Sequence, residues 1–245
     1  MSRKEAVAER ICSQELQRQP LTAFVEEPVA AAQHDRVDHA RETAHEPGAP
    51  SDLLRQDRYV PTHVALLRGI NVAGRNKVSM ADLRDVVASL GHTDVATYIQ
   101  SGNVLFTTTK KDTSALARAI ERSVAKALGV NPGIVVVSRD ELATVVNDNP
   151  YPEETNPKYV HAIFLVEKPG REMVERIAAA QRQVAQKGSR DTAQVVGKTL
   201  FLHTPDGFGT SELAAKLTGN QRAIAAGGTA RNWSTVTKLL VLCNA

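Results

Sequence analysis

The sequence predicts an α+β fold in which two β-α-β-β-α units follow one another, after an N-terminal extension of different character. Three observations support this prediction. Short runs of alternating apolar residues, typical of strands, are interspersed with segments whose apolar residues recur every three or four positions. The proline-rich stretch NPYPEETNPK, residues 149–158, separates two such series. The first 60 residues show neither pattern, and 245 residues leave room for two small domains.

The extension, residues 1–60, is predicted to be poorly ordered or weakly helical. Residues 1–61 carry eight basic and eleven acidic side chains, a net charge of −3, whereas the remaining 22 basic and 16 acidic side chains give +6. The extension holds isolated apolar residues and the turn-rich stretch HEPGAPSD, so it cannot bury enough apolar surface to offset the loss of chain entropy. The chain is therefore an acidic extension joined to a basic body.

The first α+β subdomain is predicted to span residues 61–150. A helix over residues 112–128 is indicated by Leu116, Ile120, Val124 and Leu128, which recur every four residues along one face. A tight turn at residues 101–103, Ser-Gly-Asn, joins two strands into a hairpin. The predicted elements are, in order, strand 63–69, helix 79–91, strands 95–100 and 104–109, helix 112–128, strand 133–138, and a helix capped by Ser138 and Glu141.

The second, smaller α+β subdomain is predicted to span residues 151–245. Its elements are a strand at 158–167, a helix at 171–185, a hairpin of strands 193–196 and 199–204 around Gly197-Lys198, and helices near 211–217 and 233–242. The order of elements repeats that of the first subdomain, so the two subdomains are predicted to be tandem copies of one unit.

The strands of the first subdomain are apolar on both faces. Because side chains alternate along a strand, one face of the hairpin is expected to carry Thr97, Ile99, Val104 and Phe106, and the other Tyr98 and Leu105. A sheet of this kind is covered on both sides. This argues against an open sheet that stacks RNA bases on aromatic side chains, which are only 4% of the residues.

Several classes of protein are disfavoured by composition. Cys12 and Cys243 lie near opposite ends of the chain and form no disulfide framework, so we expect a reducing cytoplasm. The apolar run LLVLC is far shorter than the about 20 residues that span a bilayer, and no membrane partner is expected. No common catalytic motif, metal-ligand spacing or cofactor motif is present; histidines 63, 92, 161 and 203 could each act as a base or serve only structure.

The loop between the first strand and the first helix is the first candidate binding segment. It reads RGINVAGRNKV, residues 68–78, and matches neither nucleotide-binding glycine motif. Its glycines let backbone amides approach a ligand closely, and Arg68, Arg75 and Lys77 add positive charge that suits a phosphate. Asn71 and Asn76 would donate hydrogen bonds, or would simply tolerate a left-handed backbone in a surface loop.

Two further segments complete the predicted site. The hairpin turn presents Gln100, Ser101, Gly102 and Asn103, which offer hydrogen-bond donors and acceptors but also suit an ordinary turn. Before the last helix, Arg231 could bind an anion, Asn232 could cap the helix, and Trp233, the single tryptophan, could wall a cleft or pack in the core.

The motifs R-G-I-N-V-x-G, Y-I-Q-S-G-N-V and R-N-W-x-T-V, at residues 68–74, 98–104 and 231–236, resemble the bacterial family known as domain of unknown function 1697, or DUF1697. The resemblance covers about residues 62–245. It implies tandem ferredoxin-like (β-α-β-β-α-β) units packed into one compact body, but no activity, substrate or catalytic residue. One departure is Glu212, where members of the family tend to be basic.

The family motifs coincide with the three candidate segments, which favours one composite site. The leading hypothesis is a cytoplasmic protein that binds a small anionic, phosphate-bearing ligand in a cleft made by these segments. One alternative is a nucleic-acid-binding module, which the basic body favours. The other is a non-catalytic interaction or regulatory domain whose motif residues only fix turns and caps. Whether the protein is an enzyme is left open.

Overall fold

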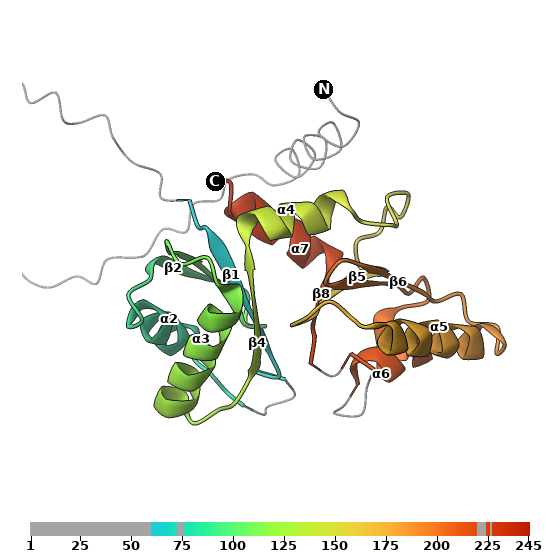
Figure 1. Ribbon diagram of the computed structural model, residues 1–245, viewed down its shortest axis with the longest axis horizontal. Coiled ribbons are helices and arrows are strands. Elements are labelled where there is room, and N and C mark those ends of the chain that lie inside the picture. The colour runs from blue at the N-terminus through green and yellow to red at the C-terminus, as the bar shows by residue number, and fades with distance from the viewer. Residues whose placement is uncertain (1–59, 73–75, 220–223, 226) are drawn as a thin grey trace, which may run out of the picture.

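The computed structural model describes residues 60–72, 76–219, 224–225 and 227–245. The prediction for the N-terminal extension and the predicted site residue Arg75 lie outside these residues. The described chain forms two antiparallel four-stranded sheets with helices, so the predicted α+β class is confirmed. Figure 1 shows the two sheets side by side, each with its own pair of helices, and a further helix pair near the C-terminus.

The first sheet contains residues of the first predicted subdomain only. Its elements are β1 (His63–Arg68), α2 (Met80–Ala88), β2 (Thr93–Tyr98), β3 (Asn103–Thr107), α3 (Thr113–Leu128) and β4 (Gly133–Ser138). The strand order is β2-β3-β1-β4, so β1 is central and β4 is an edge strand. Each predicted element of this unit is present, with bounds that differ by a few residues at most.

The second sheet repeats this arrangement. Its elements are β5 (Val160–Phe164), α5 (Arg171–Ala185), β6 (Thr192–Val196), β7 (Thr199–His203), a 3-10 turn (Phe208–Thr210), α6 (Glu212–Thr218) and β8 (Thr229–Asn232). The order β6-β7-β5-β8 matches that of the first sheet. Strand β8 was not among the elements predicted from sequence patterns, although the unit implied by the family resemblance ends in a strand. Its four residues pair with β5, with Arg231 opposite Ala162.

Helices α4 (Arg139–Asn147) and α7 (Trp233–Leu242) follow the last strand of each sheet and pack against each other. The predicted cap of α4 is present as a reciprocal capping box between Ser138 and Glu141. The apolar sides of both helices join the facing sides of the two sheets in one core. This core includes Leu66, Val135, Leu142, Val146, Phe164, Phe201, Trp233, Val236 and Leu239.

The other face of each sheet is covered by its own helices. Helices α2 and α3 bury Leu83, Val87, Leu116, Ile120 and Val124 against one sheet, and α5 and α6 bury Ile177, Val184, Leu213 and Leu217 against the other. The prediction that the sheet is covered on both sides is therefore confirmed. In the part of the chain that the structure describes, no helix has both the length and the apolar character needed to cross a bilayer.

Candidate functional site

Arg231 connects the second sheet to the first. It lies on β8 and is only 8% exposed. Its guanidinium donates to the side chain of Asn103 and to four backbone carbonyls. The distances are 2.6 Å from Nε to Asn103 Oδ1, 2.8 Å from Nη1 to Ala230 O, and 2.8, 3.1 and 3.2 Å from Nη2 to the carbonyls of Leu67, Gly102 and Ser101. Four of these five acceptors belong to β1, β3 and the hairpin turn.

The positive charge of Arg231 has no carboxylate partner among the described residues. Burial lowers the pKa of Arg231 to about 10, so the side chain remains protonated at neutral pH. A buried cation is costly unless polar groups surround it, and here carbonyl dipoles and an amide oxygen do so. The hydrogen bonds therefore hold β8 and the hairpin turn together through charge-assisted contacts.

The hairpin turn is fixed by Asn103 and Gly102. Asn103 is fully buried, and its Nδ2 donates to Tyr98 O at 2.9 Å and to Ser101 Oγ at 3.1 Å. Gly102 has φ +79, and a Cβ there would lie 2.8 Å from both Leu67 Cβ and Ile70 Cδ1. Only glycine fits this position, because both the backbone angle and the space exclude a side chain.

The strand-to-helix loop is joined to the same turn. The Nδ2 of Asn71 donates to Gln100 O at 3.1 Å and to Val78 O at 3.0 Å, and the Val78 N–H donates to Asn71 Oδ1 at 2.9 Å. The Nδ2 of Asn76 donates to Gly69 O at 2.8 Å. Both asparagines have positive φ, 53° and 48°, which this residue type tolerates better than most. The loop is thus closed on itself and held against the hairpin.

The structure brings the three predicted segments together, and it separates their residues into buried and exposed sets. Arg68, Asn76, Lys77, Gln100 and Ser101 are exposed, whereas Gly102, Asn103 and Arg231 are buried. Asn232 caps α7 by accepting from the Thr235 N–H at 2.9 Å. Trp233 lies in the core between the sheets, with its ring 6.1 Å from that of Phe201.

Two aliphatic side chains beside these exposed polar residues point outward. Val72 is 59% exposed and Ile99 is 50% exposed. Ile99 was predicted to share the apolar face of the hairpin, which is wrong because β2 ends at Tyr98 and Ile99 adopts φ 50°. A β-branched residue at positive φ is unfavourable, and such strained positions cluster at functional sites.

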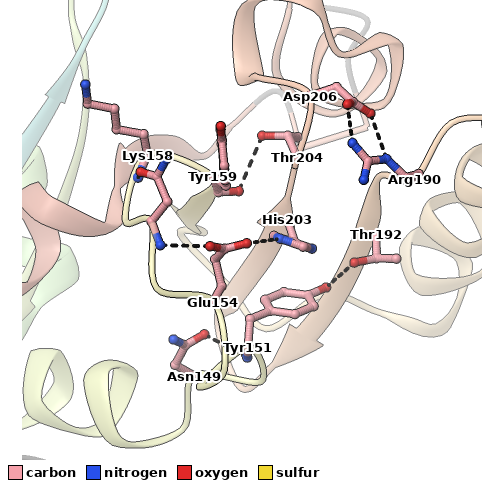
Figure 2. Close-up of polar contacts among 11 residues, drawn as sticks. Asn149, Tyr151, Glu154, Lys158, Tyr159, Arg190, Thr192, His203, Thr204 and Asp206 are labelled. Carbon is pink, nitrogen blue, oxygen red and sulfur yellow. Dashed lines mark hydrogen bonds and ion pairs between the residues drawn. The ribbon is translucent and has the colours of Figure 1, made fainter.

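A second polar cluster lies where the segment between α4 and β5 meets His203 at the end of β7 (Figure 2). His203 Nε2 lies 2.8 Å from Glu154 Oε2, and the Asn156 N–H donates to Glu154 Oε1 at 2.8 Å. The bonds from Asn156 and His203 hold the pKa of Glu154 below its usual value. The Thr192 hydroxyl donates to the Tyr151 hydroxyl at 3.1 Å, while burial raises the pKa of Tyr151.

This cluster was only partly visible in the sequence. His203 was considered as a base, but its partner Glu154 lies in the proline-rich stretch that was interpreted as a separator of the two units. The cluster attaches that stretch to β7 and β6. Among the described residues, no group of three or more histidine, cysteine, aspartate or glutamate side chains is placed to hold a metal ion.

Comparison with known proteins identifies the family. The family model described as a protein of unknown function (DUF1697) matches residues 60–201, more than half of the chain, so the chain belongs to that family. Among solved structures, the conserved bacterial protein SP0830 from Streptococcus pneumoniae is similar, with a TM-score of 0.57 and 21% identity over 75% of this chain and 99% of that one. At this identity the likeness shows the fold alone. No curated protein matches the chain.

Proposed function

We propose that this member of the DUF1697 family binds an anionic, phosphate-bearing ligand where the loop 68–78 meets the turn 100–103. We call this region the signature surface. The observation that carries the proposal is that hydrogen bonds from Arg231 and Asn71 join segments that are basic and free of acids. Residues 68–78, 100–103 and 229–233 together contain four arginine or lysine residues and no aspartate or glutamate.

The buried and exposed residues have different parts in this proposal. Arg68, Lys77, Gln100 and Ser101 are exposed and would contact the ligand, with Asn76 and the neighbouring Arg75 of the same loop. Arginine and lysine are the side chains that bind phosphate oxygens, through charge-assisted hydrogen bonds. Gly102, Asn103, Arg231, Asn232 and Trp233 would support the surface from beneath. A preformed scaffold of this kind reduces the entropy that binding must offset.

The fold supports three finer proposals. The strand order shared by both sheets supports two tandem ferredoxin-like units. The first would be residues 61–150 and the second residues 151–245, because each sheet draws its strands from one of these ranges. We also propose the cytoplasm as the compartment, since the described cysteine, Cys243, is free and buried in the core.

A non-catalytic interaction domain is the second candidate function. Val72 and Ile99 favour it, because exposed aliphatic side chains beside polar residues are typical of protein contact sites. A nucleic-acid-binding module is the third, and it predicts a steep loss of oligonucleotide binding with salt. Binding of small phosphates that depends on Lys77 but only weakly on salt would favour the leading proposal over both.

The test is isothermal titration of the full chain with inorganic pyrophosphate and with a nucleoside diphosphate. A hydrogen bond to a charged group contributes about 1.5–3 kcal/mol, so Lys77→Ala is expected to weaken binding by about tenfold or more. Arg68→Ala is expected to act in the same direction. The matched control is Arg176→Ala, an exposed arginine on α5 of the other unit. Equal affinities for all of these proteins, or no binding to any, would contradict the proposal.

A further inference from the structure

Two adjoining cavities lie along β4 and at the His63 end of β1. The first has a volume of about 340 Å³ and lies between β4, α4 and the β6–β7 hairpin. Its walls are mainly aliphatic and aromatic, including Val135, Val137, Phe164, Val196 and Phe201. Small-molecule sites are typically apolar and about 300–1,000 Å³ in volume. We call this cavity the apolar chamber.

The chamber exists because β4 is an edge strand. Residues 134–137 alternate between the two faces of the sheet, yet all four line the chamber, so it follows the free edge of the strand. The ends of this edge are blocked: the Ile134 N–H donates to Glu121 Oε1 at 2.9 Å and the Ser138 N–H to Glu141 Oε2 at 2.9 Å. An added peptide strand would compete with both carboxylates, which favours a compact ligand over a strand.

The second cavity is polar and adjoins the first. Its volume is about 640 Å³, and it shares Thr113 and Glu141 with the chamber. Its lining holds three cations, Lys110, Lys111 and Arg139. Two acids, Asp140 and Glu141, also line it, so its formal charge is +1. We call it the cationic mouth.

The two lysines are the cations of the mouth that can accept an anion. Arg139 Nε lies 3.6 Å from Asp140 Oδ1, and Glu141 is held by the capping box of α4. Neither Lys110 nor Lys111 has a carboxylate within ion-pair distance among the described residues. A net charge of +1 suits a singly charged head, such as a carboxylate, better than a doubly charged phosphate.

We propose that the chamber and the mouth together bind an aliphatic monocarboxylate, with its chain in the apolar chamber and its carboxylate at Lys110 and Lys111. Burying the chain contributes about 0.8 kcal/mol for each methylene removed from water, and the lysines select the anionic head. The mouth is separate from the signature surface, because His63 at one end of β1 lines the mouth and Arg68 lies at the other end.

The native chain supplies a probe for this site. Trp233, the single tryptophan, packs against Phe201, which lines the chamber. Sodium decanoate, kept below its micelle-forming concentration, is titrated into the full chain while the emission of Trp233 is followed. Acetate is the control that carries the carboxylate without the long chain, and decanol is the control that carries the chain without the carboxylate. We expect a saturable change with decanoate, a weaker one with decanol, and none with acetate.

Two variants separate the contributions of the chamber and the mouth. Thr144 is exposed and lies on the face of α4 that lines the chamber, so Thr144→Phe should fill the space and abolish binding of both decanoate and decanol. The double variant Lys110→Ala with Lys111→Ala should weaken decanoate by about tenfold or more and leave decanol unchanged. Its matched control is Lys168→Ala with Arg176→Ala, two exposed cations of the other unit.

The outcomes that overturn the proposal are specific. They are the absence of a saturable response to decanoate, wild-type affinity in Thr144→Phe, or the same decanoate affinity in the lysine variant as in its control. If circular dichroism shows that Thr144→Phe does not fold, Ser114→Phe blocks the chamber from α3, where Ser114 is also exposed. The same three outcomes then apply to that variant.

Discussion

Replacement of Arg231 by methionine is expected to destabilise the protein by about 1 kcal/mol. Methionine keeps an unbranched apolar side chain but removes every donor. The buried acceptors left without a partner are Asn103 Oδ1 and the carbonyl of Leu67, whereas the carbonyl of Gly102 keeps the Leu67 N–H at 2.8 Å. Each unsatisfied buried acceptor costs about 1–3 kcal/mol. Two such groups at a central value of about 2 kcal/mol amount to about 4 kcal/mol.

Part of this loss is offset because methionine carries no charge. Burial lowers the pKa of Arg231 from its ordinary value to about 10, which corresponds to a cost of about 3 kcal/mol for burying the guanidinium. Removing that cost leaves a net loss of about 1 kcal/mol. Arg231→Lys, which keeps the charge but has fewer donors, should lie between the wild type and Arg231→Met.

Urea unfolding followed by circular dichroism measures the effect. The matched control is Arg176→Met, an exposed arginine, which should change the free energy of unfolding by no more than about 0.5 kcal/mol. Asn103→Ala combined with Arg231→Met should be less destabilising than the sum of the two, because they share one hydrogen bond. If Arg231→Met were as stable as the wild type within about 0.5 kcal/mol, the view that these contacts hold the units together would be refuted.

Three further predictions concern histidine, carboxylate and glycine positions. Burial lowers the pKa of His161 to about 4, and its Nδ1 has no hydrogen-bond partner in the described part of the chain. The unfolded chain therefore binds more protons, and stability should fall as pH drops from 6.5 towards 4. His161→Phe, which keeps the stacking on Phe208, should flatten that part of a stability–pH curve; an unchanged slope would contradict this. The folded protein holds the pKa of Glu154 below its ordinary value of 4.5. The ionised Glu154 carboxylate therefore stabilises the fold above pH 4.5, and this stabilisation is lost as the pH falls through the lowered pKa. Glu154→Gln should therefore reduce the acid dependence in urea unfolding, and identical acid limbs would count against it. Gly102→Ala should cost about 3 kcal/mol or more in thermal unfolding, against about 1 kcal/mol for Gly197→Ala, whose Cβ meets open space; similar losses would disprove the steric argument.

The sequence predicted the regular elements well because each has a local cause. Helices α3 and α5 have apolar residues at helical spacing, and their observed bounds are within one residue of those expected. The cap of α4 needs only Ser138 and Glu141, three residues apart, and it forms as predicted. The repeat of strand order follows from the repeat of elements along the chain.

Strand β8 and the part played by Arg231 could not be predicted, because both depend on distant residues. Four residues containing an arginine and an asparagine give no strand pattern, and β8 is defined by pairing with β5. The acceptors of Arg231 in the first unit lie 128 to 164 positions earlier in the chain. A charged residue in a loop motif indicated ligand binding, whereas here most of its donors are used by backbone carbonyls.

In the candidate site, too, contacts between distant residues were harder to predict than local features. The sequence correctly suggested that the three segments meet, since Arg231 and Asn71 both contact the hairpin turn. It could not show which of their side chains face the solvent. Nor could it show the apolar chamber, whose walls come from β4 in one unit and from β5, β6 and β7 in the other.

Binding at the signature surface is tested most directly by amide chemical-shift mapping of the full chain during titration with pyrophosphate. The largest shifts are expected on residues 68–78 and 100–103, and they should disappear in Lys77→Ala. Saturable shifts centred elsewhere, for example around Lys110 and Lys111, or shifts that persist in Lys77→Ala, would contradict the claim that the signature surface binds the anion.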